Sequence, residues 1–407
     1  MITKDSPQPQ PRRAFKTIHA GLALLSILAG NALAAPEQEL NATPHPEIMA
    51  ALQPFVDQHQ IAGAVVVVAT KDKVLTCQAI GFSDLSAKKA MATDDLFAMA
   101  SMSKPVAITA LMLLVDEGKV RLDDPVEKYL PEFKGQMFIA EKDANHMLLK
   151  APKQPLLVRH LMTHTSGILY SEPMEKPSLD RLPLRTIVAA HAMAPLQFEP
   201  GSKFMYSNGS IATAARIVEV VSGEPYEKFV QERLLTPLGM TDTTFWPTEA
   251  QLTRLAKCYK ANAAGTDLIE TQLDYRFSFP LSDTIHRYPM PGIGLFSTAG
   301  DMLKFCQMFL NGGVYNGKRY LSAASIALMT KKETPDNVKI SYGFGWSITS
   351  DGSYGHGGSF NTNMKIDPKL GLITIFLSQH TGPMPKGAKK ADPTFEAAAK
   401  KLALAPR

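Results

Sequence analysis

Three short motifs carry the residue types that a nucleophilic acyl-transfer reaction needs. In chain order they are S-x-x-K at 101–104, Y-x-N at 206–208 and H-G-G at 356–358. The serine is a nucleophile, the lysine and the tyrosine can each accept its proton, and a glycine-rich edge can offer backbone N–H groups to a substrate oxygen. Each motif is weak evidence alone, but their joint order favours a serine-based site.

Chance occurrence separates the informative matches from the others. A chain of 407 residues should contain roughly one or two S-x-x-K tetrads by accident, and a second copy does occur at Ser86–Lys89. That copy lies in a short polar stretch after a predicted strand, whereas Ser101 precedes a long apolar run with helical period. The single H-G-G is rarer, since average composition gives about 0.04 matches in such a chain. The candidate nucleophile is therefore Ser101.

A helix that begins at Ser101 would place Lys104 on the same face, one turn away. Its N-terminus would add positive potential at the serine. Serine is a poor nucleophile without a base in contact. Both a partly buried Lys104 with a lowered pKa and a Tyr206 phenolate could be that base, and the pair should titrate as a coupled unit. The sequence leaves the choice between them open.

The glycines of the third motif could complete an oxyanion site. Gly357 and Gly358 follow a predicted strand, and glycines let a substrate approach the backbone closely. A backbone N–H just beyond them could pair with that of Ser101, and one such donor contributes about 10²–10³ in rate.

The first 34 residues have the features of a signal peptide. A basic segment at 12–16 precedes the apolar run 20–30 and the cleavage-site-like Ala32-Leu33-Ala34. The apolar run is shorter than the roughly 20 residues that span a bilayer, and no later segment reaches that length. We therefore expect a periplasmic or secreted protein, cut after Ala34, with no stable membrane anchor.

Charge and metal-ligating residues indicate neither a nucleic-acid partner nor a cofactor. Residues 1–34 carry +3 of the formal net charge of +5, so the remaining chain is only mildly basic. His160 and His164 are four residues apart, but Leu161 breaks the H-E-x-x-H pattern, and we expect His164 to brace a turn. No Walker loop, dinucleotide fingerprint or metal-ligand spacing occurs. The three cysteines lie far apart in the sequence and are expected to be mostly buried and inert: Cys77, Cys258 and Cys306.

Strand-like runs occur toward the two ends of the chain and helical runs in its middle. A hairpin is expected over 61–70 and 74–81, and later strands over 343–349, 352–355, 361–367 and 372–379. Helices are expected over 97–118, 158–162, 184–193, 211–221 and 392–404. The polar stretch 134–155 has no strong period and predicts a surface loop near the site.

The simplest architecture is one antiparallel sheet built from both chain ends and covered by helices, with an inserted all-helical lobe. We accordingly assign residues 35–95 and 300–407 to an α/β domain and residues 96–299 to a mainly helical domain. A site is expected in the cleft between them.

In these motifs the chain resembles the penicillin-recognising serine hydrolases, most of all the class C β-lactamase and family VIII carboxylesterase branch. The family elements S-x-x-K, Y-x-N and K/H/W-[STG]-G match in order and approximate spacing. Three further matching segments are His164-Thr165-Ser166-Gly167, Pro237-Leu238-Gly239-Met240 and the stretch 292–298. The similarity extends over most of the chain and implies a β-lactamase-like α/β fold.

The resemblance also implies roles for individual residues. It implies an acyl-enzyme on Ser101, oxyanion donors from the N–H groups of Ser101 and Ser359, and a Tyr206 that activates the deacylating water. Asn208 would hydrogen-bond Lys104 and the substrate. The expected catalytic residues are thus Ser101, Lys104 and Tyr206, and the expected substrate-binding residues are Asn208, His356, Gly357, Gly358 and Ser359.

One departure from the family pattern bears on the substrate. Many β-lactamases carry a lysine where this chain has His356, and a histidine is only partly charged near neutral pH. We therefore expect an exported serine hydrolase of esters or amides, β-lactams included, with ester, amide and short-peptide substrates favoured over β-lactams by this departure. A D,D-peptidase-like cell-wall enzyme and a non-turnover binding protein of the same fold are the alternatives. The sequence does not set the oligomeric state.

Overall fold

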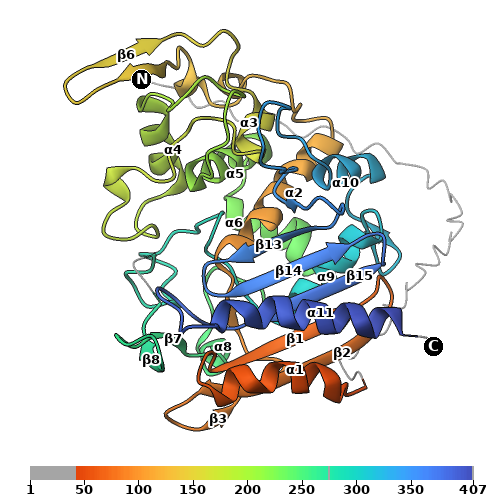
Figure 1. The fold of residues 1–407 in the computed structure, drawn as a ribbon. Helices are drawn as coiled ribbons and strands as arrows, with labels where there is room; N and C mark the ends of the chain where they lie inside the picture. Colours follow the sequence, from red (N-terminus) through yellow and green to blue (C-terminus); the bar gives the residue numbers. More distant parts are fainter. Residues whose placement is uncertain (1–42, 274–275, 406–407) are drawn as a thin grey trace, which may run out of the picture. The chain divides into compact units, whose positions relative to one another are not determined.

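The computed structural model describes residues 43–273 and 276–405 (Figure 1). The predicted signal segment 1–34 lies outside these residues. Among the described helices, none combines the length and the apolarity that crossing a bilayer requires. The domain boundaries expected at residues 95 and 300 stay a prediction.

A seven-stranded antiparallel sheet joins the two ends of the described chain. Its order is β12-β13-β14-β15-β1-β2-β3, so β1 (Gly63–Ala69) lies between β2 (Val74–Asp84) and β15 (Leu372–Leu377). Val67 of β1 is paired with Ile375 of β15. The hairpin and the sheet from both chain ends are confirmed. The other strands of the sheet are β3 (Lys89–Ala90), β12 (Ser347–Ile348), β13 (Tyr354–Gly358) and β14 (Thr362–Asp367).

Both faces of this sheet are covered, which explains why β1 is apolar throughout. Val65 and Val67 belong to the larger hydrophobic core, together with residues of α9. Val66 and Val68 point to the opposite face and pack in a second core with residues of α1 and α11, and these two helices lie across the front of the sheet in Figure 1. The three covering helices are α1 (Pro46–Asp57), α9 (Ala299–Leu310) and α11 (Ala391–Leu404).

The stretch between the sheet's two halves contains most of the described helices, but it is not all-helical as expected, because two hairpins also lie in it. The predicted helices 158–162 and 184–193 are confirmed as α3 (Val158–Met162) and α4 (Leu184–Met193). The predicted helix 211–221 begins earlier, at Asn208, because the Ser207 side chain caps it by accepting the Ser210 N–H at 3.0 Å. Further helices are α2 (Ser103–Asp116), α5 (Asn208–Ser222), α6 (Tyr226–Val230), η5 (Gln231–Leu235), α7 (Thr236–Leu238), α8 (Glu249–Leu252) and α10 (Ala323–Met329).

The run expected as one helix over 97–118 is three elements. Phe97–Ala98 forms β4, which pairs with β9 (Phe296–Ser297), and the short turn η1 (Ala100–Met102) separates it from α2. The expectation was right for the long apolar part and wrong for its beginning. Pairing with a segment distant in the chain leaves no local period to detect.

The loop expected over 134–155 is wrong. This stretch contains a hairpin of β5 (Phe138–Lys142) and β6 (Met147–Lys150). The sequence of β6, M-L-L-K, does not alternate between apolar and polar residues, so it has no strand period to detect, and all four residues are exposed. A second hairpin of the middle region, β7 (Cys258–Ala261) with β8 (Leu268–Thr271), was not predicted either, nor were α1 and α9.

The strand expected over 343–349 shortens to β12. Gly345 has φ of +82°, a left-handed conformation that interrupts an extended strand.

All three cysteines of the chain are buried and free: Cys77, Cys258 and Cys306. Burial raises the pKa of the Cys77 thiol to about 11, which disfavours the reactive thiolate.

Candidate active site

Ser101 lies in the tight turn η1, directly before α2. We expected it in the first turn of the α-helix itself. Ala100, the residue before it, has φ of +46°, which is uncommon for a residue with a side chain and costs about 1–3 kcal/mol. Two bonds hold this turn: Ser103 Oγ donates to the Ala100 carbonyl at 2.7 Å, and Met99 N donates to the Leu295 carbonyl at 2.8 Å. The backbone strain is therefore localised next to the candidate nucleophile.

Lys104 is fully buried and its ammonium nitrogen has three oxygen neighbours. Nζ lies 3.1 Å from Ser101 Oγ, 2.7 Å from Asn208 Oδ1 and 3.0 Å from the Gly292 carbonyl. Burial, and secondly the positive charge of Arg276, hold the pKa of Lys104 well below its usual range. A neutral amine has two N–H donors and one lone pair. Those donors match the Asn208 and Gly292 oxygens, which leaves the lone pair for the Ser101 hydroxyl.

Gly292 is a site residue that sequence reasoning missed. A Cβ there would lie 2.9 Å from Asn208 Oδ1 and 3.4 Å from Lys104 Nζ. Only glycine lets this backbone approach the lysine closely enough to accept its hydrogen bond. The segment 292–298 matched the family pattern, but nothing local in it connects a carbonyl to Lys104, which lies far away in the chain.

Tyr206 contacts both Ser101 and Lys104. Its hydroxyl shares a hydrogen bond with the Ser101 side chain, and Lys104 Nζ lies 4.5 Å from its ring centroid. Burial raises the pKa of Tyr206, and the bond to Ser101 offsets part of this rise. The phenol is therefore the favoured form, next to a lysine whose neutral form is favoured.

His164 holds the backbone on both sides of Tyr206. The Met205 N–H donates to the His164 carbonyl at 2.9 Å, and the Ser207 N–H donates to His164 Nδ1 at 3.2 Å. The imidazole is fully buried and packs against the Tyr206 ring with centroids 4.5 Å apart. The expected turn-bracing role of His164 agrees with these contacts. His160 is also buried, and its Nδ1 accepts the Leu157 N–H at 3.1 Å.

His356 is buried and bonded at both ring nitrogens. Nδ1 lies 2.9 Å from the Gly357 carbonyl and Nε2 lies 3.0 Å from the Tyr342 hydroxyl. A carbonyl only accepts, so Nδ1 carries the proton and Nε2 accepts from Tyr342. Burial, and then the charge of Lys104, lower the pKa of His356 to about 3. The histidine is thus neutral. Tyr342 was not singled out in the sequence.

The end of β13 packs against the segment that leads into Ser101. A Cβ on Gly358 would collide with the Met99 carbonyl and with Thr362 Oγ1, and Thr362 Oγ1 itself donates to the Met99 carbonyl at 3.1 Å. This close approach explains the glycine at position 358. Gly357 and Ser359, on either side of it, are exposed.

A buried cation lies beside Ser359. The Arg276 guanidinium donates to Ser359 Oγ and stacks over the Phe360 ring, 4.3 Å from its centroid. Arg276 was not singled out in the sequence. The structure thus brings all the predicted site residues into one region, and adds Gly292, Tyr342 and Arg276 to them.

The second S-x-x-K tetrad lies elsewhere, in the turn between β2 and β3. Ser86 is exposed and donates to Asp84 Oδ1 at 2.7 Å, and Lys89 Nζ donates to the Thr253 carbonyl at 2.9 Å. The two side chains of this tetrad therefore have other partners.

Within 43–273 and 276–405, no group of three His, Cys, Asp or Glu side chains is arranged to hold a metal ion.

Known proteins resemble this chain over most of its length. The family model described as Beta-lactamase matches residues 48–399. Protein Rv1367c of Mycobacterium tuberculosis is 31% identical over 364 residues, which are 81% of this chain and 89% of that protein. A putative D-alanyl-D-alanine carboxypeptidase of Escherichia coli K12 is 30% identical over 70% of this chain and 69% of its own length.

A solved structure confirms the fold. The structure described as EstCE1, a hydrolase with promiscuous acyltransferase activity, has a TM-score of 0.72 and 26% identity, and covers 87% of this chain and 97% of its own. The predicted β-lactamase-like arrangement of an antiparallel sheet and helices is therefore right. By sequence match and fold, the chain belongs to the beta-lactamase family and is a serine hydrolase.

Proposed function

We propose that this protein hydrolyses carboxylic esters through an acyl-enzyme on Ser101. Ser101 Oγ attacks the ester carbonyl carbon, the bond to the leaving alcohol breaks, and water later attacks the acyl carbon and releases the acid. The observation that carries the proposal is the placement of Lys104 Nζ, 3.1 Å from Ser101 Oγ and fixed by the Asn208 and Gly292 oxygens.

Lys104 acts in this proposal as the base for acylation. Burial lowers its pKa well below the usual range and so favours the neutral amine, whose lone pair faces the Ser101 hydroxyl. Tyr206, with its raised pKa, is the phenol that protonates the leaving alkoxide and takes its proton back from Lys104. In deacylation the same pair removes a proton from water and returns it to Ser101 Oγ. The two groups titrate together.

The backbone N–H groups of Ser101 and Ser359 would stabilise the oxyanion. The contact of Gly358 and Thr362 with the Met99 carbonyl supports this pairing, because it fixes the end of β13 beside the turn that carries Ser101. Asn208 would orient Lys104 and contact the substrate. His356, Gly357 and Gly358 would form the edge along which the substrate lies.

Esters are favoured over β-lactams because His356 is neutral. The bonds of its two nitrogens and its pKa of about 3 leave no positive charge at this position for a substrate carboxylate. A second candidate function, cleavage of peptides with a free carboxyl terminus, is supported by one observation. The Arg276 guanidinium beside Ser359 is a cation close to the same edge.

The proposal includes export of the protein from the cytoplasm, and the support for export comes from the sequence of the first 34 residues. The basic segment 12–16, the apolar run 20–30 and the Ala32-Leu33-Ala34 site fit a signal peptide. Sequencing the N-terminus of the protein recovered from periplasm and medium tests it, with Ala35 as the expected first residue.

The hydrolysis of p-nitrophenyl butanoate and of benzylpenicillin by the purified protein tests the proposed reaction, with Ser101→Ala as the control. We expect ester cleavage that Ser101→Ala abolishes, with much slower penicillin turnover. Intact-mass analysis of a quenched reaction should show a butanoyl adduct on Ser101. Ester cleavage that survives in Ser101→Ala would refute the proposed nucleophile, and a long-lived penicillin adduct without ester turnover would favour the peptidase.

A further inference from the structure

The Arg276 side chain holds the turn that joins β13 to β14. This turn, residues 358–361, is closed by a backbone hydrogen bond of 3.1 Å between its first and last residues. Arg276 donates to Ser359 Oγ, and its guanidinium carbon lies 4.3 Å from the centroid of the Phe360 ring. Both corner residues of the turn are therefore in contact with one side chain.

The same turn packs on the segment that leads into Ser101. Phe360 is fully buried and belongs to one small apolar core with Ala100, the neighbour of the nucleophile. The hydrogen bond that closes a turn uses the N–H of its last residue. The N–H of its second residue, Ser359, is not used by that bond and can serve a substrate oxygen.

Arg276 is only 6% exposed, yet it is a cation. Burial lowers the pKa of Arg276, but the pKa of a guanidinium is so high that the group keeps its charge in proteins. A guanidinium is also weakly hydrated and stacks well on aromatic faces, which suits its place over Phe360.

The charge of Arg276 acts on Lys104 as well. After burial, this charge is the second cause that lowers the pKa of the lysine. Tyr206, His164 and His356 also face the lysine, and burial favours the neutral form of each. Among these side chains, only Arg276 carries a charge, and a cation there favours the neutral amine.

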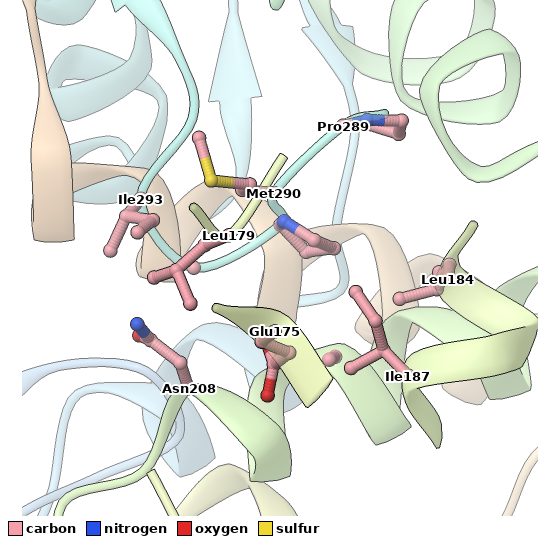
Figure 2. A pocket seen from close by; sticks show the side chains of 11 residues that line it. Glu175, Leu179, Leu184, Ile187, Asn208, Pro289, Met290 and Ile293 are labelled. Carbon is pink, nitrogen blue, oxygen red and sulfur yellow. The ribbon is translucent and has the colours of Figure 1, made fainter. Parts of the chain in front are cut away.

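The segment that begins with Arg276 continues to another side of the site. Later in this segment the Gly292 carbonyl accepts a hydrogen bond from the lysine at 3.0 Å. Figure 2 shows that end of the segment, with Met290 and Ile293 around the same small apolar pocket as Asn208. A change at position 276 therefore needs a control at another buried arginine of the same segment.

We propose that Arg276 is a positioning residue for the oxyanion donor Ser359. By holding the side chains of Ser359 and Phe360, it fixes the Ser359 N–H beside the turn that carries the nucleophile. Its buried charge adds positive potential where negative charge develops on the substrate oxygen. The inference rests on the proposed acyl-enzyme at Ser101.

The test measures the hydrolysis of p-nitrophenyl butanoate by Arg276→Gln. This ester is uncharged, so the arginine cannot act on it by pairing with a substrate carboxylate. Glutamine keeps an N–H donor but has no charge. We expect kcat to fall about 10–100-fold while KM changes less than about threefold. The midpoint of the acid limb of kcat/KM should move up by about half a pH unit or more, because the lysine loses a neighbouring cation.

Two further variants separate the contact from the charge. Arg276→Lys keeps a cation without the planar fork, so the midpoint should return toward the wild type and kcat should recover in part. Ser359→Ala removes the Oγ that Arg276 holds and leaves the N–H, so kcat should fall without a shift of the midpoint. Combined with Arg276→Gln, its effect on kcat should be smaller than the product of the two single effects.

Arg287 provides the matched control. It is 2% exposed, its guanidinium carbon lies 5.2 Å from the centroid of the Phe277 ring, and its Nε donates to Asp180 Oδ2 at 3.1 Å. Arg287→Gln leaves the buried Asp180 carboxylate without this partner, so Tm should fall. The midpoint of the pH profile should stay as in the wild type.

The outcomes separate this inference from the function on which it rests. A wild-type kcat and midpoint in Arg276→Gln, or an equal shift of the midpoint in Arg287→Gln, overturns the positioning role and leaves the ester hydrolase standing. A loss of kcat that only parallels a fall in Tm, with no shift and no recovery in Arg276→Lys, also overturns it. An absence of Ser101-dependent turnover in the otherwise unchanged protein overturns both.

Discussion

The Tyr342 hydroxyl lies 3.0 Å from Nε2 of His356 and fixes the tautomer of this histidine. Nδ1 carries the single ring proton and donates it to the Gly357 carbonyl. Nε2 accepts the Tyr342 hydroxyl proton, so its lone pair is already used. His356 is therefore a neutral group, and the titrating groups at the nucleophile are Lys104 and Tyr206.

We therefore expect ester hydrolysis to fall as the pH is lowered, and His356 not to cause this fall. The base must be unprotonated, so kcat/KM should decrease below the apparent pKa of the coupled Lys104–Tyr206 pair, which the burial of Lys104 brings well below 10.5. His356 has a pKa of about 3 and stays neutral across this range. Profiles of kcat/KM against pH for the wild type and His356→Gln should have the same midpoint, and a displaced midpoint would assign the titration to His356.

The division of labour between Lys104 and Tyr206 can be tested with two leaving groups. Lys104→Met should lower kcat/KM by about 10³-fold or more on both a p-nitrophenyl and a simple alkyl ester, because the base is lost. Tyr206→Phe should lower kcat/KM more on the alkyl ester than on the p-nitrophenyl ester, because an alkoxide needs a proton to leave and p-nitrophenolate does not. An equal loss on both esters in Tyr206→Phe would make Tyr206 the base instead.

Gly292→Ala should weaken catalysis without unfolding the protein. The added Cβ would press on Asn208 Oδ1 at 2.9 Å and displace the lysine contact. We expect kcat/KM to fall about 10–100-fold, a loss of a few kcal/mol in transition-state stabilisation. Thermal melting serves as the control, since a loss of activity that only parallels a large drop in Tm would indicate a merely structural glycine.

His164 is expected to act as a positioning residue for Tyr206. His164→Ala removes both the acceptor for Ser207 N–H and the ring that packs on the tyrosine. We expect kcat to fall by about 10²-fold with a smaller change in KM. Asparagine tolerates the φ of +58° at this position and offers a side-chain oxygen, so His164→Asn should recover part of the loss. No recovery in a folded His164→Asn would argue against this role.

The sequence predicted those features whose signals are local. The apolar run of β1 and the periods of α4 and α5 indicated strands and helices, and three motifs indicated Ser101, Lys104 and Tyr206. Gly292 and Tyr342 were missed because their roles exist only through contacts with Lys104 and His356 across the fold. The hairpin β5–β6 was missed because neither β5 nor β6 alternates between apolar and polar residues in the sequence.

Glu175 should make the folded state less stable as the pH rises. Burial raises its pKa from 4.5 to about 7, with the nearby Glu172 charge adding to this and the Glu172 N–H opposing it. Between these two values the folded chain holds a proton that the unfolded chain has lost, so this residue's contribution to the free energy of unfolding declines from about pH 4.5 to about pH 7. Glu175→Gln removes that decline. The Tm of the variant relative to the wild type should therefore rise across this range by several degrees, and a difference that is constant with pH would show that Glu175 does not titrate there.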